Sequence, residues 1–193
     1  LIECIIGEND PMIQVIPNKQ KLISIKQKII ELCSLLFENQ EEYYYKYKFN
    51  EKIMKPKLIS QALQSNYLSA IYYLNEYYQT HFVIIINNKY YPTSSKSYPK
   101  QYILHNQDNN QMISINSEVT FEDILPPLIK NDLSIKSYIC IYNVDLKPIQ
   151  QYKLGDCIEL AKEYNLSLYT KDQKRKIKKD LYKDIYIYLV NQL

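Results

Sequence analysis

Glycine, tryptophan and arginine are scarce in this chain. Among its 193 residues there are two glycines and no tryptophan, and Arg175 is the single arginine. Two glycines are too few to build the glycine-rich loops that hold phosphate in Walker and dinucleotide-binding sites. Lysine, which supplies nearly all of the basic residues, lacks the planar fork that binds guanine or phosphate through two hydrogen bonds. The sequence therefore argues against a nucleotide-binding enzyme and gives little support to a protein that recognises specific base sequences.

Residue groups that bind metals or perform catalysis are also lacking. His81 and His105 are the two histidines, and neither has a Cys, Asp or Glu at the spacing of metal ligands. The four cysteines lie apart inside apolar runs and form no CxxC pair, which is typical of buried, reduced thiols. No nucleophile motif such as GxSxG occurs. We therefore expect no metal, no cofactor and no enzymatic activity.

Long apolar runs are missing as well. The longest, residues 81–86, is far shorter than the roughly 20 residues that a transmembrane helix needs. A hydrophobic content of 46% in a chain of this length is enough to bury one core. We expect a single domain over residues 1–193, with no membrane contact.

Tyrosine and lysine are abundant instead. The chain has 21 tyrosines, and its formal net charge of +3 is small for a nucleic-acid-binding protein. Residues 171–179 carry a dense basic run, which either binds phosphate or forms the solvated face of a helix. The sequence leaves both interpretations open.

Extended runs between turn residues predict several strands. Residues 81–86 and 90–93 are predicted to form a hairpin over Asn87 and Asn88, two residues that tolerate positive φ. Residues 102–104 and 112–115 are interpreted either as an extension or as a second, smaller hairpin. Alternating or continuous apolar runs predict further strands at residues 1–6, 67–78, 137–144 and 157–168.

Apolar residues spaced three and four apart predict helices elsewhere. They predict an amphipathic helix over residues 21–38 and a short helix over residues 57–65. A C-terminal helix is predicted over about residues 171–193, with an apolar stripe formed by Ile177, Leu181, Ile185 and Tyr188. Residues 41–56 are tyrosine-rich and have no clear period, so we predict a surface insertion there.

The order of these elements predicts a β-rich α+β fold, a five-stranded OB-fold barrel. Thr120 is placed to cap a short helical stretch that Pro126 and Pro127 limit, and this stretch separates the third strand from the fourth. The predicted barrel carries a helical insertion over about residues 8–66 after its first strand, and the C-terminal helix at its end. This order favours a binding module over an enzyme.

Acidic residues gather around the predicted connecting helix. Glu118, Glu122, Asp123 and Asp132 lie among Ile, Leu and Phe residues. They form either an exposed acidic ridge beside apolar anchors or the favourable carboxylates of a helix N-terminus. An acidic ridge suits a basic protein partner, because complementary charge orients the encounter.

Four segments resemble, in order, strands of telomerase OB-fold subunits: LIECIIG, THFVIIINNKYYPTS, SYICIYNV and CIELAKEYNLSLYT. In the last segment, apolar residues fall where that family has them, at Ile158, Leu160, Tyr164, Leu166 and Leu168. The chain thus resembles the OB-fold hub subunit of the ciliate telomerase holoenzyme. That subunit is similar to the mammalian shelterin subunit that recruits telomerase and to the small yeast telomerase subunit.

The resemblance implies a non-catalytic scaffold in the nucleus, at telomeres. Such a subunit binds the N-terminal domain of the telomerase reverse transcriptase through an acidic patch, in the segment where Glu118, Glu122 and Asp123 fall here. It bridges the enzyme to other OB-fold telomerase or telomere subunits and supports processive repeat synthesis. Its association with telomerase RNA and telomeric DNA is indirect.

Two other functions fit the same sequence. An OB-fold domain can bind single-stranded DNA or RNA directly, by stacking bases on Tyr90, Tyr91, Tyr138 and Tyr142. The chain can also be an accessory subunit of another large assembly, in which the tyrosine-rich tract is a packing surface. Tyrosine content does not separate these alternatives, because tyrosines occur throughout the chain.

Overall fold

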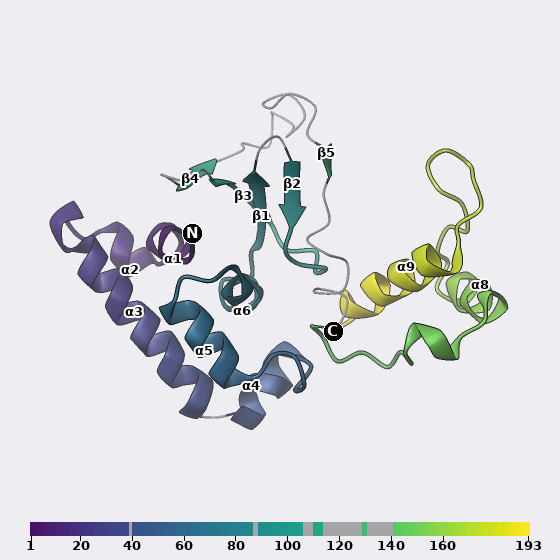
Figure 1. Ribbon diagram of the computed structural model, residues 1–193, viewed down its shortest axis with the longest axis horizontal. Coiled ribbons are helices and arrows are strands. Elements are labelled where there is room, and N and C mark those ends of the chain that lie inside the picture. The colour runs from purple at the N-terminus through teal and green to yellow at the C-terminus, as the bar shows by residue number, and fades with distance from the viewer. Residues whose placement is uncertain (39, 87–88, 106–109, 114–128, 131–140) are drawn as a thin grey trace. The chain divides into compact units, whose positions relative to one another are not determined.

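The structure is a computed structural model that describes residues 1–38, 40–86, 89–105, 110–113, 129–130 and 141–193. The chain divides into two compact units, Leu1–Ile141 and Tyr142–Leu193 (Figure 1). The first unit holds a series of helices followed by a sheet, and the second holds a pair of α-helices. Among the helices described, none is long and apolar enough to cross a bilayer.

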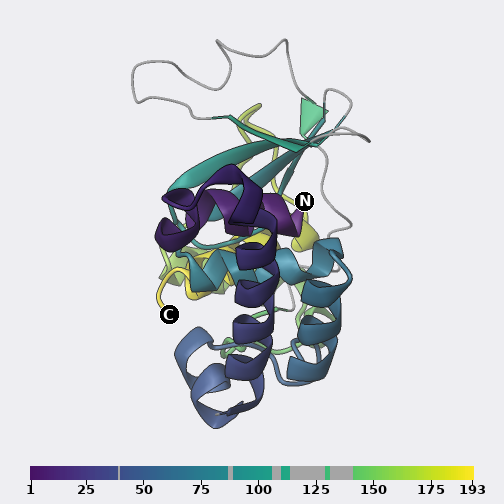
Figure 2. The ribbon, with the colours of Figure 1, turned by 90° about the vertical axis from the view of Figure 1, so that its left-hand side faces the viewer.

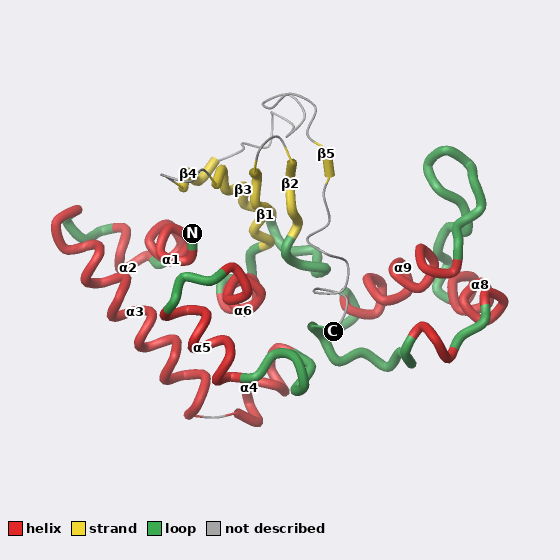
Figure 3. The backbone as a smooth tube through the Cα atoms, viewed as in Figure 1, coloured by secondary structure: helices red, strands yellow, loops and turns green. Residues whose placement is uncertain are grey.

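Helices come first in the larger unit (Figure 3). They are α1 (Ile2–Asn9), α2 (Pro11–Gln14), α3 (Asn18–Glu38), α4 (Gln40–Tyr47), α5 (Pro56–Gln64), the 3-10 helix η1 (Leu68–Ala70) and α6 (Ile71–Tyr77). The Asp10 side chain starts α2, because it accepts hydrogen bonds from two backbone N–H groups of the first turn, at 2.9 and 3.3 Å. The buried face of α3 includes Ile29, Leu32 and Leu36. Figure 2 shows α3 and α5 side by side, in agreement with their extensive contact.

The sheet of this unit is open and mixed. Its strands are β1 (His81–Ile86), β2 (Lys89–Pro92), β3 (Lys100–His105), β4 (Asn110–Ile113) and β5 (Ile129–Lys130), in the order β4-β3-β1-β2-β5. β1 pairs antiparallel with β2 and parallel with β3, while β3 and β4 are antiparallel and β2 and β5 are parallel. Five of the six residues of β1 are buried, as expected for a central strand that is covered on both faces.

A buried polar network joins α6 to the sheet. The Asn75 side chain donates to the carbonyl and hydroxyl oxygens of Thr93, both at 3.0 Å, and accepts from the Phe82 N–H at 3.0 Å. The Thr93 hydroxyl donates to the Phe82 carbonyl. The neighbouring Glu76 side chain, 1% exposed, forms an ion pair with Lys96 at 2.8 Å. These bonds satisfy polar groups that would otherwise be costly to bury.

The smaller unit is a helix pair. It contains the 3-10 helix η2 (Ile149–Gln151), α8 (Leu154–Glu163) and α9 (Lys178–Val190). Cys157 and Ala161 of α8 pack with Leu181 and Ile185 of α9 to form a core. The rings of Tyr164 and Tyr188 stack with their centroids 4.9 Å apart, and Tyr152 and Tyr182 are in contact at 6.1 Å.

The predicted five-stranded OB-fold barrel is wrong, because the described sheet is open and two predicted barrel strands are helical. Residues 1–6 form most of α1, and residues 157–168 contain most of α8. In the first segment, Ile2, Ile5 and Ile6 are all buried on one helical face, three and four residues apart. In the second, Cys157 and Ala161 have the same spacing. Short apolar runs do not distinguish a strand from a buried helix, and tertiary packing decided both cases.

Two further segments differ from expectation. Residues 67–78, predicted as a strand, are η1 and α6, where Ala70, Ile71 and Leu74 are fully buried at helical spacing. Residues 41–56, predicted as a surface insertion, include most of α4, whose Tyr43 and Tyr47 side chains are 5% and 8% exposed. Tyr43 and Tyr47 are therefore core residues, whereas Tyr45 of the same tract is 76% exposed.

Other elements are confirmed. The helices predicted over residues 21–38 and 57–65 are α3 and α5, and the predicted hairpin is β1 with β2. Of the two interpretations of the next extended runs, the structure has the second, smaller hairpin, β3 with β4. The C-terminal helix exists as α9 but begins at Lys178, seven residues later than expected. Most of the strand predicted over residues 137–144, and the cap at Thr120, lie outside the described residues.

Replacing Asn75 with Leu tests the polar network. Asn75→Leu leaves the Phe82 N–H and the Thr93 hydroxyl without their side-chain partner, so the free energy of unfolding should fall by about 2–4 kcal/mol. Urea denaturation followed by circular dichroism measures this loss. Gln27→Leu on the exposed face of α3 is the control and should change the free energy by less than about 0.5 kcal/mol. Equal losses in both variants would show that the network contributes nothing.

Candidate functional site

Net charge is divided unequally between the two units. Leu1–Ile141 contains 14 Lys and Arg residues and 14 Asp and Glu residues, so its formal charge is zero. Tyr142–Leu193 contains ten basic and seven acidic residues, and therefore carries the whole net charge of +3. Six of its ten basic residues fall between positions 171 and 179, where Asp172 is the only acid. The small net charge of the chain thus conceals one local basic segment.

This basic segment belongs to an ordered hairpin that connects α8 to α9. We call residues 167–177 the basic hairpin; it is the loop that projects between these two helices (Figure 3). Its two arms are joined by a backbone bridge between Tyr169 and Arg175. Backbone bonds run from Lys176 N to Leu168 O at 2.9 Å and from Thr170 N to Lys174 O at 2.8 Å. At the tip, Gln173 has φ 57° and thereby reverses the chain.

Lys176 fastens the hairpin to α9. Its Nζ lies 2.7 Å from a carboxylate oxygen of Asp184 and donates to the carbonyl oxygen of Ser167 at 2.8 Å. The side chain of Lys176 is 16% exposed and that of Asp184 is 34% exposed. Lys176 therefore has a structural role, although it lies in the middle of the basic run.

The remaining basic side chains are directed to solvent. Lys171, Lys174, Arg175 and Lys179 are all exposed. In the part of the chain that the structure describes, no ion pair engages any of the four. Tyr169, 56% exposed, lies beside Arg175 on the other arm of the hairpin. The hairpin thus presents several cations together with one accessible aromatic ring.

The first turn of α9 adds an electrostatic cost. Lys178 and Lys179 lie at the N-terminus of this helix, where the unpaired N–H groups already create partial positive charge, and Asp180 is the one acid of the turn. Cations are unfavourable there, and an anion is favourable. Burial raises the pKa of the adjacent Cys157 thiol in spite of Lys178, so Cys157 stays neutral and serves as a core residue. An external anion would relieve the repulsion among these lysines.

The structure describes only some of the residues that the sequence predicts to bind partners. Glu118, Glu122, Asp123 and Asp132 lie outside the described residues, as does Tyr138. Tyr90 and Tyr91 lie on β2 of the open sheet, next to β1. Tyr142 is 4% exposed, and its N–H donates to the Tyr186 hydroxyl, so this side chain is buried within the helix pair. The Tyr142 ring is therefore too buried to stack on a base.

The sequence contained one signal for this hairpin. Asn165 has φ 55°, the left-handed conformation that commonly ends a helix, and Asn tolerates it well. Cys157, Ala161 and Tyr164 are spaced four and three residues apart, as on one face of a helix. Asn165 directly follows the last of them, which is typical of a helix end. Because residues 157–168 were predicted as a strand, the turn that follows α8 at Asn165 was not predicted.

Neither a metal-ligand cluster nor a similar known protein points to an activity for the described part of the chain. Among the described residues, no group of three or more His, Cys, Asp or Glu side chains is placed to hold a metal ion. No protein-family model matches the chain, and neither a curated protein nor a solved structure matches it significantly. The likeness to telomerase OB-fold subunits therefore depends only on short segments, and α1 contains six of the seven residues of LIECIIG while half of CIELAKEYNLSLYT lies in α8.

Replacing Lys176 with Met tests how the hairpin is held. Lys176→Met keeps the aliphatic stem but removes the ion pair with Asp184, so hydrogen exchange at the backbone amide of residue 176 should become about two- to fivefold faster. Asp184→Asn should produce the same acceleration. Lys179→Met, at an exposed position outside this ion pair, is the matched control and should leave the exchange rate unchanged. Unaltered exchange in the first two variants would remove Lys176 from the anchoring role.

Proposed function

We propose that the unit Tyr142–Leu193 binds nucleic acid through the phosphate backbone, with the basic hairpin and the first turn of α9 as the contact surface. The observation that carries this proposal is the concentration of the chain's net positive charge on one ordered, exposed segment. Phosphate contacts by Lys and Arg supply most of the affinity of sequence-independent nucleic-acid binding. The site has no catalytic role in this proposal.

The electrostatics of α9 support an anionic partner over a merely solvated surface. Besides Lys176, which is paired with Asp184, five basic residues lie within nine positions, and two of them are at the positive end of a helix. A phosphate placed between the hairpin and this helix end would be attracted by the lysines, by the N–H groups and by the helix dipole together. Lysines that contact only water would have no comparable electrostatic attraction at this position.

The composition of the surface indicates backbone contacts with little reading of base sequence. Lysine acts on phosphate as a point charge, and Arg175 is the one residue able to form a bidentate contact. Tyr169 adds an exposed ring on which a base or sugar can stack. Nucleic-acid binding was an alternative from the sequence, and we now assign it to the helix pair instead of an OB barrel. Scaffolding of telomerase stays a prediction without structural support.

A salt titration of matched variants tests the proposal. Binding of the full chain to a short fluorescent DNA duplex, and to a single strand of the same sequence, is measured by anisotropy between about 50 and 200 mM salt. The variant Lys171→Gln, Lys174→Gln, Arg175→Gln should lose on the order of tenfold or more in affinity, with a salt slope smaller by about 2–3.

The control removes the same charge from the same unit at other exposed positions: Lys147→Gln, Lys153→Gln, Lys162→Gln. It should retain the affinity and the salt slope of the unaltered chain, apart from a small long-range effect. Equal weakening by both variants would assign the binding to diffuse charge and not to the hairpin. No binding of the unaltered chain at the lowest salt would refute the proposal.

A further inference from the structure

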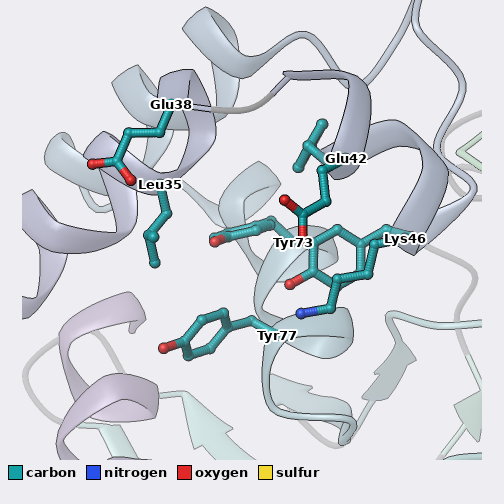
Figure 4. A pocket seen from close by; sticks show the side chains of 8 residues that line it. Leu35, Glu38, Glu42, Lys46, Tyr73 and Tyr77 are labelled. Atoms are coloured by element: carbon teal, nitrogen blue, oxygen red, sulfur yellow. The ribbon is translucent and has the colours of Figure 1, made fainter.

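A pocket of about 180 Å³ lies among α3, α4 and α6 of the larger unit. Four tyrosines from two helices form much of its lining: Tyr43, Tyr47, Tyr73 and Tyr77. We call it the tyrosine pocket. Figure 4 shows Tyr73 and Tyr77, both from α6, directed into the space that faces Leu35 of α3. The tyrosine-rich tract of the sequence thus contributes to a concave site.

Tyr43, Tyr47 and Tyr73 of the pocket are neutral phenols at physiological pH. Burial raises the pKa of Tyr43, Tyr47 and Tyr73 above the usual value for a phenol. The same three rings contact one another, with Tyr43 and Tyr73 6.0 Å apart and Tyr47 and Tyr73 6.0 Å apart between centroids. A neutral phenol offers an electron-rich ring face and an acceptor oxygen, and both attract cations. The pocket therefore favours positive charge without being a phenolate site.

Two carboxylates strengthen this preference. Glu38 at the end of α3 and Glu42 in the first turn of α4 line the pocket, and Figure 4 shows Glu42 beside Tyr73 and Glu38 near Leu35. Both residues are exposed, so they lie where a ligand would enter from solvent. Lys46 is the one basic residue in the lining. Carboxylates at the mouth of an aromatic pocket add Coulomb attraction for a cation to the attraction of the rings.

Ammonium groups of the chain already lie on tyrosines of this pocket. Lys46 Nζ is 5.1 Å from the ring centroid of Tyr47, and Lys28 Nζ is 5.6 Å from that of Tyr77. Lys28 is also paired with Asp10 at 3.3 Å and Glu31 at 2.9 Å, so it is held in place. Lys46 is exposed, and Figure 4 shows its ammonium group turned toward the tyrosines. The rings of Tyr47 and Tyr77 thus each have an alkylammonium group as a neighbour.

We propose that the tyrosine pocket binds an alkylammonium group from outside the chain, with Lys46 as the resident group that it displaces. The entering ammonium would stack on the ring of Tyr47 or Tyr77 and pair with Glu38 and Glu42. The group comes either from a free polyamine or from a lysine side chain of another polypeptide, which share this chemistry. The proposal is independent of nucleic-acid binding, because it concerns a different unit of the chain.

Saturation-transfer NMR with the full chain tests this proposal. The probes are butylammonium chloride, spermidine and Nα-acetyl-lysine amide, titrated at constant ionic strength. Butylammonium should bind the unaltered chain; Glu42→Gln should weaken binding about two- to fivefold, and Lys46→Gln should strengthen it by a similar factor. A purely structural role of these exposed residues would not move the two affinities in opposite directions.

Matched controls exist on the same helix and next to it. Glu41→Gln removes a carboxylate that does not line the pocket, and Lys48→Gln removes an ammonium that lies on Tyr45, 4.2 Å from its centroid, outside the pocket. Both controls should leave the affinities unchanged. Tighter binding of spermidine than of the other probes identifies a polyamine, and tighter binding of acetyl-lysine amide identifies a peptide lysine. No binding of any probe, or equal effects of Glu42→Gln and Glu41→Gln, would overturn the proposal.

Discussion

The hydrogen bonds of the Asn75 side chain join the helical part of the larger unit to its sheet. Asn75 lies on α6 and bonds to both β1 and the residue after β2, so one group fixes a helix against two strands. β1 is buried along nearly its whole length, and its residue Phe82 is hydrogen-bonded to Asn75 and Thr93 outside the strand ladder. Apolar packing of Ile and Phe side chains is not directional, whereas this network specifies one position of α6 along the strands.

In the smaller unit the corresponding constraint is electrostatic. Four core residues hold α8 against α9, and this packing leaves six basic residues crowded at the hairpin and the helix start. One of these charges, that of Lys176, forms an ion pair with Asp184 and so holds the hairpin against α9. Lys178 and Lys179 lie at a cost to stability, since cations oppose the dipole at the start of α9. The phosphate ligand that we propose would offset this cost.

Local pattern predicted some elements and failed on others for identifiable reasons. α3, α5 and the hairpin of β1 and β2 followed from apolar spacing and turn residues, because their patterns are long or bounded by turns. α1, α6 and α8 were assigned to strands, because runs such as LIECII place apolar residues so densely that periods of two and of 3.6 both fit. The basic run at residues 171–179 is evident in the sequence. The hairpin that exposes it was not predicted, because residues 157–168 were assigned to a strand instead of to α8. The tyrosine pocket needed α4 and α6 to be helices, and it was therefore invisible in the sequence.

We propose that residues 167–179 contact nucleic acid. Amide chemical-shift mapping of the full chain, titrated with a short DNA duplex at low salt, locates the contact surface residue by residue. We expect shifts concentrated between Ser167 and Asp180, with the largest at Lys174, Arg175 and the first turn of α9, and little change at Tyr90 and Tyr91 on β2. Shifts centred on the sheet, or no shifts at the hairpin under conditions where DNA is bound, would contradict the proposal.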